Sequence, residues 1–579
     1  MQDMQTSPAS ATPAVPRIPV MSAPVRLPRV DGWTLGVIGL AALATSPILA
    51  VLGIALESSG GAWAHLSSTV LGTYIDQTFR LILGVGAGVL ILGVATAWLV
   101  TMFEFPGRSV LQWALLLPLA MPAYIAAYTY TDVLEFAGPV QTGLRELFGW
   151  QRPGDYWFPE IRSLGGAVTF MSLVLYPYVY LLARAAFVEQ SQSLWDAARG
   201  LGLGTWKCFI RVGLPLARPA IAIGVLLALM ETLNDFGTVD YFAVQTLTVG
   251  VYRVWFGMNN APAAAQLASM VLALVLVMAA LERIARGRRR YQFNHNAPRR
   301  HPLARLHGVR GLLALLTCAT PLTLGFVIPA TLMAASAVGS YGSATGVDTL
   351  RLAFNSLAVA GMAALVCLCG GLFLAYGSRL SGTALVKGAA RVASMGYTVP
   401  GVVLAVGVLI PAAALDNAID GFMRSHFNTS TGLIFSGTLY ALVFACAVRF
   451  LALSFGSLEA GLTKITPNMD AAARSLGHRP GGVLARIHFP LLRGSLLTGA
   501  MLVFVDAMKE LPMTLILRPF NFSTLATHVY EYASYEAFEQ AAVAALFIVI
   551  AGLAPVIALS LSFTGSGRFS QPQPAEPES

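Results

Sequence analysis

Charged residues are scarce in this sequence. Only 11% of the 579 residues are Asp, Glu, Lys or Arg, whereas 56% are hydrophobic, and the mean hydropathy is +0.68. A soluble domain carries about 25% charged residues, and a disordered chain needs low hydrophobicity together with high charge. Both classes are therefore excluded. The composition predicts an all-α polytopic membrane protein, because helices of about 20 residues with short loops allow roughly a dozen spans.

Cysteine is scarce as well, and one nucleotide-binding motif is missing. Five scattered cysteines are too few for a disulfide framework. No Gly-x-x-x-x-Gly-Lys-Ser/Thr motif occurs, so the chain has no P-loop. We therefore expect no ATP hydrolysis by this chain, no enzymatic activity and no cofactor. Four cysteines lie in apolar runs and are expected to be small buried hydrophobes: Cys318, Cys367, Cys369 and Cys446.

The first 30 residues have no apolar core after a charged start, so they are not a cleaved signal peptide. We interpret residues 1–30 as a disordered cytoplasmic tail. Twelve apolar runs follow, six on each side of an arginine-rich segment, and each is long enough to span a bilayer. They cover residues 33–56, 78–102, 110–135, 164–187, 220–243, 263–282, 311–337, 352–376, 392–415, 432–455, 494–517 and 541–563.

Basic residues concentrate in every second loop. If the N-terminal tail is inside, the cytoplasmic segments hold most of the loop cations, and the outer loops hold acids such as Asp155, Glu160 and Glu536. This alternation is what the positive-inside rule requires. We therefore predict a multi-pass protein of a bacterial inner membrane with both termini cytoplasmic. The cytoplasmic segments are 103–109, 188–219, 283–310, 377–391, 456–493 and the C-terminal tail.

Residues 283–310 contain nine arginines and no acidic residue. A basic run can bind nucleic acid, but between membrane spans it is typical of a cytoplasmic loop that faces anionic lipid. We expect the lipid bilayer, and no nucleic acid, as its partner. His295, His301 and His307 lie in this segment, where the surrounding cations oppose metal binding.

Two long basic loops repeat one motif, each after the fourth span of its half, and we call them the first elbow (188–219) and the second elbow (456–493). Ala, Leu and Arg favour a helix, a glycine permits the positive φ that ends one, and a proline stops or restarts one. Each elbow is therefore predicted to be a helix, a turn and a second helix. The matched residues are Asp196, Ala197, Ala198, Arg199, Gly202 and Pro215 in the first elbow, and Ala471, Ala472, Ala473, Arg474, Gly477 and Pro490 in the second.

This motif resembles the Glu-Ala-Ala loop of inner-membrane permeases in binding-protein-dependent ABC importers, and the resemblance covers nearly the whole chain, twice. It implies a type I permease-like fold with two homologous six-helix halves. In that family the loop docks on the ATP-binding subunit, which implies two copies of that subunit and a periplasmic binding protein as partners. The family's Glu is Asp196 here, but the second elbow has Ala471 with Asp470 before it, so no salt bridge is implied there.

The resemblance divides the chain into five parts. The two halves contain one elbow each, and the elbows act as the coupling loops to the ATP-binding subunits. The parts are a tail (1–30), a first half (31–282), a basic cytoplasmic linker (283–310), a second half (311–563) and a cytoplasmic tail (564–579).

Four acidic residues also repeat, at the same separation along the chain as the two elbows. Glu231 and Asp235 follow the first elbow, and Asp506 and Glu510 follow the second. The i, i+4 spacing predicts that each pair shares one helix face, at a depth where an unpaired carboxylate costs several kcal/mol.

Two interpretations of these residues stay open. Together with Asn234 and Lys509, they could line a pathway between the halves and offer transient oxygen contacts, with no fixed site, to an ion such as Fe³⁺. Alternatively, they pair with Lys509 and backbone groups and hold broken helices together.

The segments Glu231–Gly237 and Asp506–Pro512 resemble those of ferric-iron importer permeases. Permeases for thiamine, sulfate, molybdate or polyamines are the alternatives, and a secondary transporter of twelve spans is a further one that would lack the elbows. Pro122 and Pro400 are predicted to kink the third span of each half. Six tyrosines could be iron ligands, although packing is the more usual role: Tyr124, Tyr128, Tyr130, Tyr176, Tyr178 and Tyr180.

Overall fold

A computed structural model describes residues 32–190, 192–287, 304–339 and 346–565. The two predicted tails lie almost wholly outside these ranges, as do His295, His301 and most of the basic linker. Apart from loops and turns, the described part of the chain is helical, with one parallel pair of two-residue strands, β1 (Phe103–Glu104) and β2 (Ala304–Arg305). The all-α prediction is therefore confirmed.

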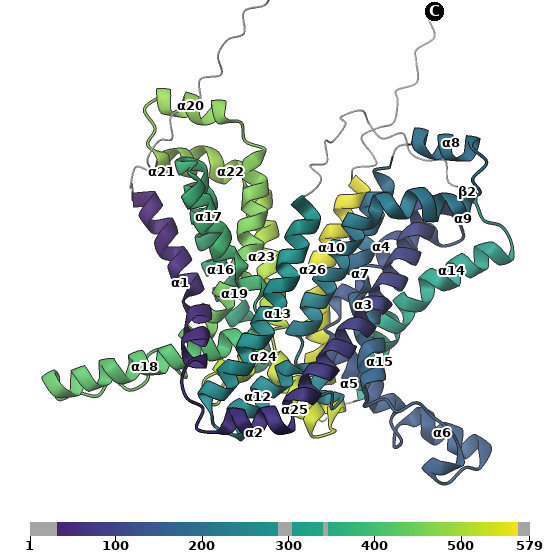
Figure 1. Ribbon diagram of the computed structural model, residues 1–579, viewed down its shortest axis with the longest axis horizontal. Helices are drawn as coiled ribbons and strands as arrows, with labels where there is room; N and C mark the ends of the chain where they lie inside the picture. The colour runs from purple at the N-terminus through teal and green to yellow at the C-terminus, as the bar shows by residue number, and fades with distance from the viewer. Residues whose placement is uncertain (1–31, 191, 288–303, 340–345, 566–579) are drawn as a thin grey trace, which may run out of the picture.

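The described helices divide between the two halves of the chain (Figure 1). The first half contains α1 (Gly32–Ala55), α2 (Ala62–Thr69), α3 (Leu71–Met102), α4 (Arg108–Ala114), η1 (Leu117–Ala120), α5 (Ala123–Leu134), α6 (Pro139–Phe148), η2 (Pro153–Asp155), α7 (Leu164–Val188), α8 (Gln192–Gly200), α9 (Thr205–Cys208), η3 (Phe209–Gly213), α10 (Leu214–Asn234), α11 (Gly237–Tyr241), α12 (Leu247–Gly257) and α13 (Ala261–Gly287). The second half contains α14 (Val309–Leu322), η4 (Thr323–Val327), α15 (Ile328–Gly339), α16 (Gly346–Ser381), α17 (Ala384–Ala393), η5 (Ser394–Thr398), α18 (Gly401–Phe427), α19 (Leu439–Thr463), α20 (Pro467–Ser475), α21 (Pro480–Val483), η6 (Leu484–His488), α22 (Phe489–Leu491), α23 (Arg493–Met508), α24 (Pro512–Leu517), α25 (Leu525–Ser534) and α26 (Phe538–Gly565).

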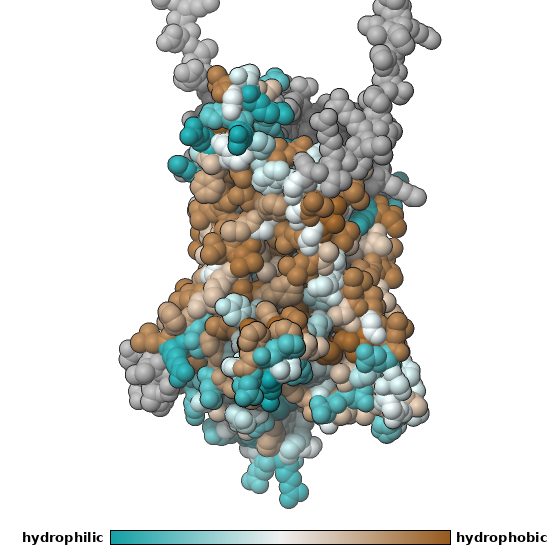
Figure 2. All heavy atoms as spheres, turned by 90° about the vertical axis from the view of Figure 1, so that its left-hand side faces the viewer, coloured by the Kyte–Doolittle hydropathy of each residue, from teal (hydrophilic) through white to brown (hydrophobic). Residues whose placement is uncertain are grey.

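Ten helices of the described residues are long and apolar enough to cross a membrane, and the number is twelve if each of two bent pairs counts as one span. Twelve is the number that the sequence predicts. Figure 2 shows the corresponding apolar belt, with polar side chains gathered above and below it. A surface of this kind is stable only where lipid replaces water around its middle.

Several predicted span boundaries were wrong because helices break inside the apolar runs. The third run is split between α4–η1 and α5–α6, which meet at 90°. Pro122 and Pro400 do not kink a continuous helix; they are the N-cap residues at which α5 and α18 begin. The fifth run ends at Asn234 and the eleventh at Met508. Hydropathy does not reveal such breaks, since the residues that follow are still mostly apolar.

The two halves interlock through their first spans. α1 packs against α16, α17 and α18 of the second half, whereas α14 packs against α3 and α15 against α5 of the first half. The last spans also cross over, because α13 contacts α18 and α26 contacts η1 and α5. The space between the halves is therefore enclosed by helices from both.

The elbow helices α8 and α20 lie at the same end of the molecule, and α2, α12 and α25 lie at the other (Figure 1). We call these the elbow face and the opposite face.

Cysteine burial follows packing more than hydropathy. Cys369 is exposed, which corrects the expectation of burial, whereas Cys318, Cys367 and Cys446 are buried. Cys369 lies on a side of α16 that no other described helix covers.

Candidate functional site: two elbows and a cavity between the halves

The two elbow turns have nearly identical backbone geometry. Gly202 has φ +80° and Gly477 has φ +82°. In the first turn the N–H of Gly202 donates to the carbonyl of Arg199 at 2.9 Å, and in the second that of Gly477 donates to Arg474 at 3.0 Å. Apart from the adjoining chain, no atom of the described residues would lie within 4 Å of a Cβ at either glycine. Glycine is therefore needed for the left-handed backbone and not for lack of space.

The residue after the turn also binds back to the helix in both elbows. The N–H of Leu203 donates to Ala198 at 3.2 Å, and that of His478 donates to Ala473 at 3.1 Å. Ala198 and Ala473 are buried, whereas Asp196, Ala197 and Arg199 are exposed, as are their counterparts Ala471, Ala472 and Arg474. The shared exposed face is thus made by the residues that the sequence repeats.

The prolines act differently from the prediction in the first elbow. Pro215 does not stop the helix, since residues Thr205–Asn234 form one continuous span. A π turn, η3, precedes it, and a matching π turn, η6, occupies the same place in the second elbow. A π turn already disrupts the regular hydrogen bonding, so the missing N–H of proline adds little cost. Pro490 precedes a bend of 78° before α23. The helix that leads from the elbow into the membrane is therefore broken in the second half and continuous in the first.

Aromatic packing holds the first elbow against the bundle. Trp195 is buried, and its ring centroid lies 5.4 Å from that of Trp98 on α3. Trp98 also packs against Phe209 at 4.5 Å and Phe187 at 5.4 Å. A Cβ on Gly213 would lie 2.8 Å from the Trp195 ring, so this glycine makes room for the tryptophan.

Charged and polar contacts hold the second elbow. Asp470, the counterpart of Trp195, accepts from Arg379 Nε at 2.8 Å and lies 2.7 Å from Nε2 of buried His488. Tyr376 on α16 donates to the carbonyl of Pro480 at 2.7 Å. Burial opposes ionisation of Asp470, but the hydrogen bonds from Arg379 and His488 outweigh it and hold the pKa of this carboxyl below its usual range. Sequence reasoning noted Asp470 only as a neighbour of Ala471 and missed its partners, which are distant in sequence.

The i, i+4 carboxylates do not share a helix face, because each helix ends between them. α10 ends at Asn234 and α23 at Met508, so Asp235 and Glu510 lie beyond the ends. Asp235 accepts from the N–H of Thr238 at 2.9 Å, and Glu510 accepts from that of Met513 at 3.2 Å. Both carboxylates thus stabilise the first turn of the short helix that follows, as anions do at helix N-termini.

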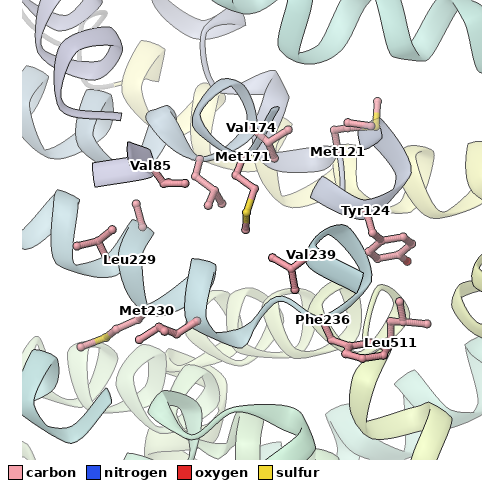
Figure 3. Packing of buried hydrophobic residues seen from close by; sticks show 14 of the residues in the cluster. Val85, Met121, Tyr124, Met171, Val174, Leu229, Met230, Phe236, Val239 and Leu511 are labelled. Carbon is pink, nitrogen blue, oxygen red and sulfur yellow. The ribbon is translucent and has the colours of Figure 1, made fainter. Parts of the chain in front are cut away.

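A small cavity of about 90 Å³ lies between these two breaks. It is lined by all six residues that the sequence assigns to a pathway: Glu231, Asn234, Asp235, Asp506, Lys509 and Glu510. Phe236 and Leu511, which occupy matching positions in the two halves and are almost fully buried, line it as well. Figure 3 shows these two side chains together, with Tyr124 nearby. A larger cavity of about 340 Å³ extends toward Glu282 and Arg283, at the end of α13 on the elbow face.

Partners neutralise the two carboxylates of the second half. Lys509 Nζ lies 2.9 Å from Asp506, and Arg449 Nη1 lies 3.1 Å from Glu510. The Arg449–Glu510 pair is buried, and sequence reasoning missed Arg449, which comes from α19. Glu231 has no ion pair with any described residue. Within the described ranges no group of three or more His, Cys, Asp or Glu side chains is placed to hold a metal ion.

The six tyrosines have three different environments. Tyr130, Tyr176 and Tyr180 donate to the backbone carbonyls of Leu324, Leu115 and Gln112, which is a packing role. Tyr124 and Tyr178 line the small cavity, together with Tyr397 of η5, which the sequence did not single out. The ring of Tyr128 packs between those of Tyr124 and Tyr241, with centroid distances of 5.7 and 4.4 Å. Spacing alone could not sort these residues, because they alternate along the same helices.

Residues 89–291 match the family described as binding-protein-dependent transport system inner membrane component. Over 489 residues the chain is 23% identical to the Fe(3+)-transport system permease protein FbpB 2 of Haemophilus influenzae, covering 84% of this chain and 89% of that protein. It is 29% identical over 191 residues to the molybdenum transport system permease protein ModB of Escherichia coli K12, covering 32% of this chain and 80% of ModB. It is 28% identical over 201 residues to the sulfate transport system permease protein CysT of the same strain, covering 32% of this chain and 66% of CysT.

The match to the family model spans most of the first half, and the elbow motif within it recurs in the second half at the same topological position. The similarity to the Haemophilus permease extends over both halves. The alternative of a secondary transporter is set aside by this match. The chain is therefore similar to the inner membrane components of binding-protein-dependent transport systems, in residues 89–291 to the family and over both halves to the Haemophilus permease, and this similarity supports the transmembrane permease subunit of an ABC importer.

Proposed function

We propose that this permease carries ferric iron, delivered by a periplasmic binding protein, across the inner membrane. The observation that carries the proposal is the similarity to a ferric-iron permease over both halves of the chain. The cavity between the halves supports it, because carboxylate, amide and phenol oxygens line it, and such oxygens suit small, highly charged cations.

We further propose that each elbow docks one copy of an ATP-binding subunit and that the elbow face is cytoplasmic. The exposed, repeated residues around Arg199 and Arg474 support docking, and the basic residues in the elbows and linker support the orientation. Both termini are then inside, since α1 begins and α26 ends on the elbow face (Figure 1). A cysteine introduced at position 206, where Trp206 is exposed, should resist an impermeant thiol reagent in intact cells and react in inverted vesicles. Labelling from outside would contradict the orientation.

The transport experiment measures uptake of radioactive iron by cells that express the permease with its binding protein and ATPase. Glu231→Gln and Asp506→Asn remove charge and keep shape, so each should lower uptake with no change in permease level or ATPase assembly. Normal uptake by the double variant would remove both carboxylates from the mechanism. Poor insertion of the variants would instead support the structural role that the sequence left open.

An oxyanion is the second candidate substrate. Two cations, Arg449 and Lys509, line the cavity, and parts of the chain resemble the molybdenum and sulfate permeases ModB and CysT. Both side chains are, however, paired with carboxylates of the same half. Their charge is therefore not available to an anion, which favours a cation as the substrate. Uptake of molybdate or sulfate, with no uptake of iron, would decide for the oxyanion.

A further inference from the structure

Four residues line both the small and the large cavity and therefore lie where the two meet: Tyr178, Glu231, Asn234 and Tyr397. Three come from α7 and α10 of the first half, and Tyr397 comes from η5 of the second. These side chains therefore lie at the boundary between the two cavities. We call this group of four the junction.

The junction contains oxygen atoms without partners. Asn234 is buried, and its Oδ1 accepts no hydrogen bond from the described residues. Within the same part of the chain, neither the Glu231 carboxylate nor the hydroxyls of Tyr178 and Tyr397 take part in a hydrogen bond. Buried polar atoms in folded proteins are nearly always satisfied, by protein, water or ligand. Asn234 Oδ1 is such an atom, and the other three side chains of the junction are half-buried. A buried oxygen without a partner, beside three half-buried ones that also line the cavities, indicates a place that holds a bound species.

At the corresponding place in the second half, the carboxylate already has a partner of opposite charge. Glu231 and Asn234 match Asp506 and Lys509 at the separation that relates the two elbows. Lys509 neutralises Asp506 within its own half, whereas Asn234 offers Glu231 no charge. Tyr178 and Tyr397 line the same two cavities as Glu231. Sequence duplication alone would make the two halves equivalent, and the Asn234–Lys509 difference makes them unequal at this place.

We propose that the junction binds one multivalent, oxygen-preferring cation, against the first half and off the axis that relates the halves. Carboxylate, amide and phenol oxygens are hard ligands. Lys509 and Arg449 do not oppose the ion, because Asp506 and Glu510 neutralise them. A single carboxylate with three neutral oxygens makes a weak site, and conduction needs a site that the ion can leave. The identity of the ion as iron rests on the proposed function, but the site does not.

Terbium(III) tests the site directly, because nearby tyrosines sensitise its luminescence and it prefers oxygen ligands. The full-length chain, in discs of uncharged lipid, should show saturable luminescence. Glu231→Gln should weaken the affinity at least tenfold, and Tyr178→Phe should weaken it severalfold and reduce the intensity. Tyr176→Phe is the matched control, since Tyr176 lies on the same helix but donates to a backbone carbonyl. Glu536→Gln is the control for ions bound at the exposed opposite face.

Unchanged terbium affinity in Glu231→Gln and in Tyr178→Phe, with both chains monodisperse, would overturn the proposal. So would a response to molybdate or sulfate that depends on Glu231 while terbium gives none. If Glu231→Gln does not fold, Glu231→Asp keeps the charge and shortens its reach, and the proposal requires that it change the affinity without removing it. Glu231-dependent terbium binding without iron uptake would support the site and refute iron as the substrate. Iron uptake without Glu231-dependent terbium binding would support iron as the substrate and refute the site.

Discussion

The two elbows have the same backbone and different anchors. Both turn at a glycine near φ +80° and both continue through a π turn. The first is held by Trp195 among Trp98, Phe187 and Phe209, and the second by Asp470 between Arg379 and His488. The two elbows therefore share their exposed shape, while the contacts that fasten each elbow to the bundle have diverged. Packing and ion pairing respond differently to mutation and to salt, so the comparison can be tested.

The largest effect on one elbow is expected from Trp195→Ala. Removing a large buried aromatic leaves a cavity and costs about 3–5 kcal/mol, and the loss should be confined to the first elbow. Amide hydrogen exchange should show faster opening of α8 and unchanged protection of α20. Trp206→Ala, on an exposed ring of the same elbow, is the control and should change little. Equal loss of protection in both elbows would show that they are not independently anchored.

Gly202→Val and Gly477→Val should have the next largest effect, and an equal one. A β-branched residue in the left-handed region costs about 1–3 kcal/mol, and the surroundings of both glycines are open. Transport should fall about tenfold or more in either variant, while the spans stay inserted. Gly204→Ala is the control. Gly204 has φ −68°, which any residue can adopt, and the matching position of the second elbow is occupied by Arg479. Normal transport by both valine variants would disprove docking through these turns.

Asp470→Asn should loosen only the second elbow, by about 1–3 kcal/mol, because a charged acceptor is lost between two donors. Arg379 still donates hydrogen bonds to the carbonyls of Leu462 and Ile465, so the second elbow should lose only part of its stability. Raising the salt concentration should weaken wild-type protection of α20 slightly and leave that of α8 unaffected. Equal salt sensitivity of the two elbows in hydrogen exchange would contradict the assignment of their anchors.

The smallest effect on stability is expected at the exposed position where the family has Glu. Asp196→Ala and Ala471→Glu should each change the stability of their elbow by less than about 1 kcal/mol, since exposed charges contribute little. Any larger effect should appear only in the ATPase rate of the assembled transporter. A change in hydrogen exchange of the permease alone would show that Asp196 has an intramolecular role.

Patterns local in sequence predicted much of this molecule. The twelve apolar runs, the glycine turns and the exposed repeat around Arg199 and Arg474 all follow from residue type and spacing. The carboxylate pairs were wrongly placed on one helix face, because i, i+4 spacing implies a shared face only where a helix is continuous. The helix is not continuous here, because α10 ends at Asn234. The sequence did not indicate this break, since the residues on both sides of it are mostly apolar.

The sequence by itself determined the fold class, the apolar runs that form ten to twelve candidate spans among the described residues, and the position of both elbows, because hydropathy, glycine and repetition act over short stretches of chain. Only the tertiary structure decided which charges are neutralised. Arg449 meets Glu510 and Arg379 meets Asp470 across 61 and 91 residues, whereas Glu231 meets no cation among the residues that the structure describes. Ion pairing depends on the distance between side chains from different helices, and that distance is set by how the helices pack.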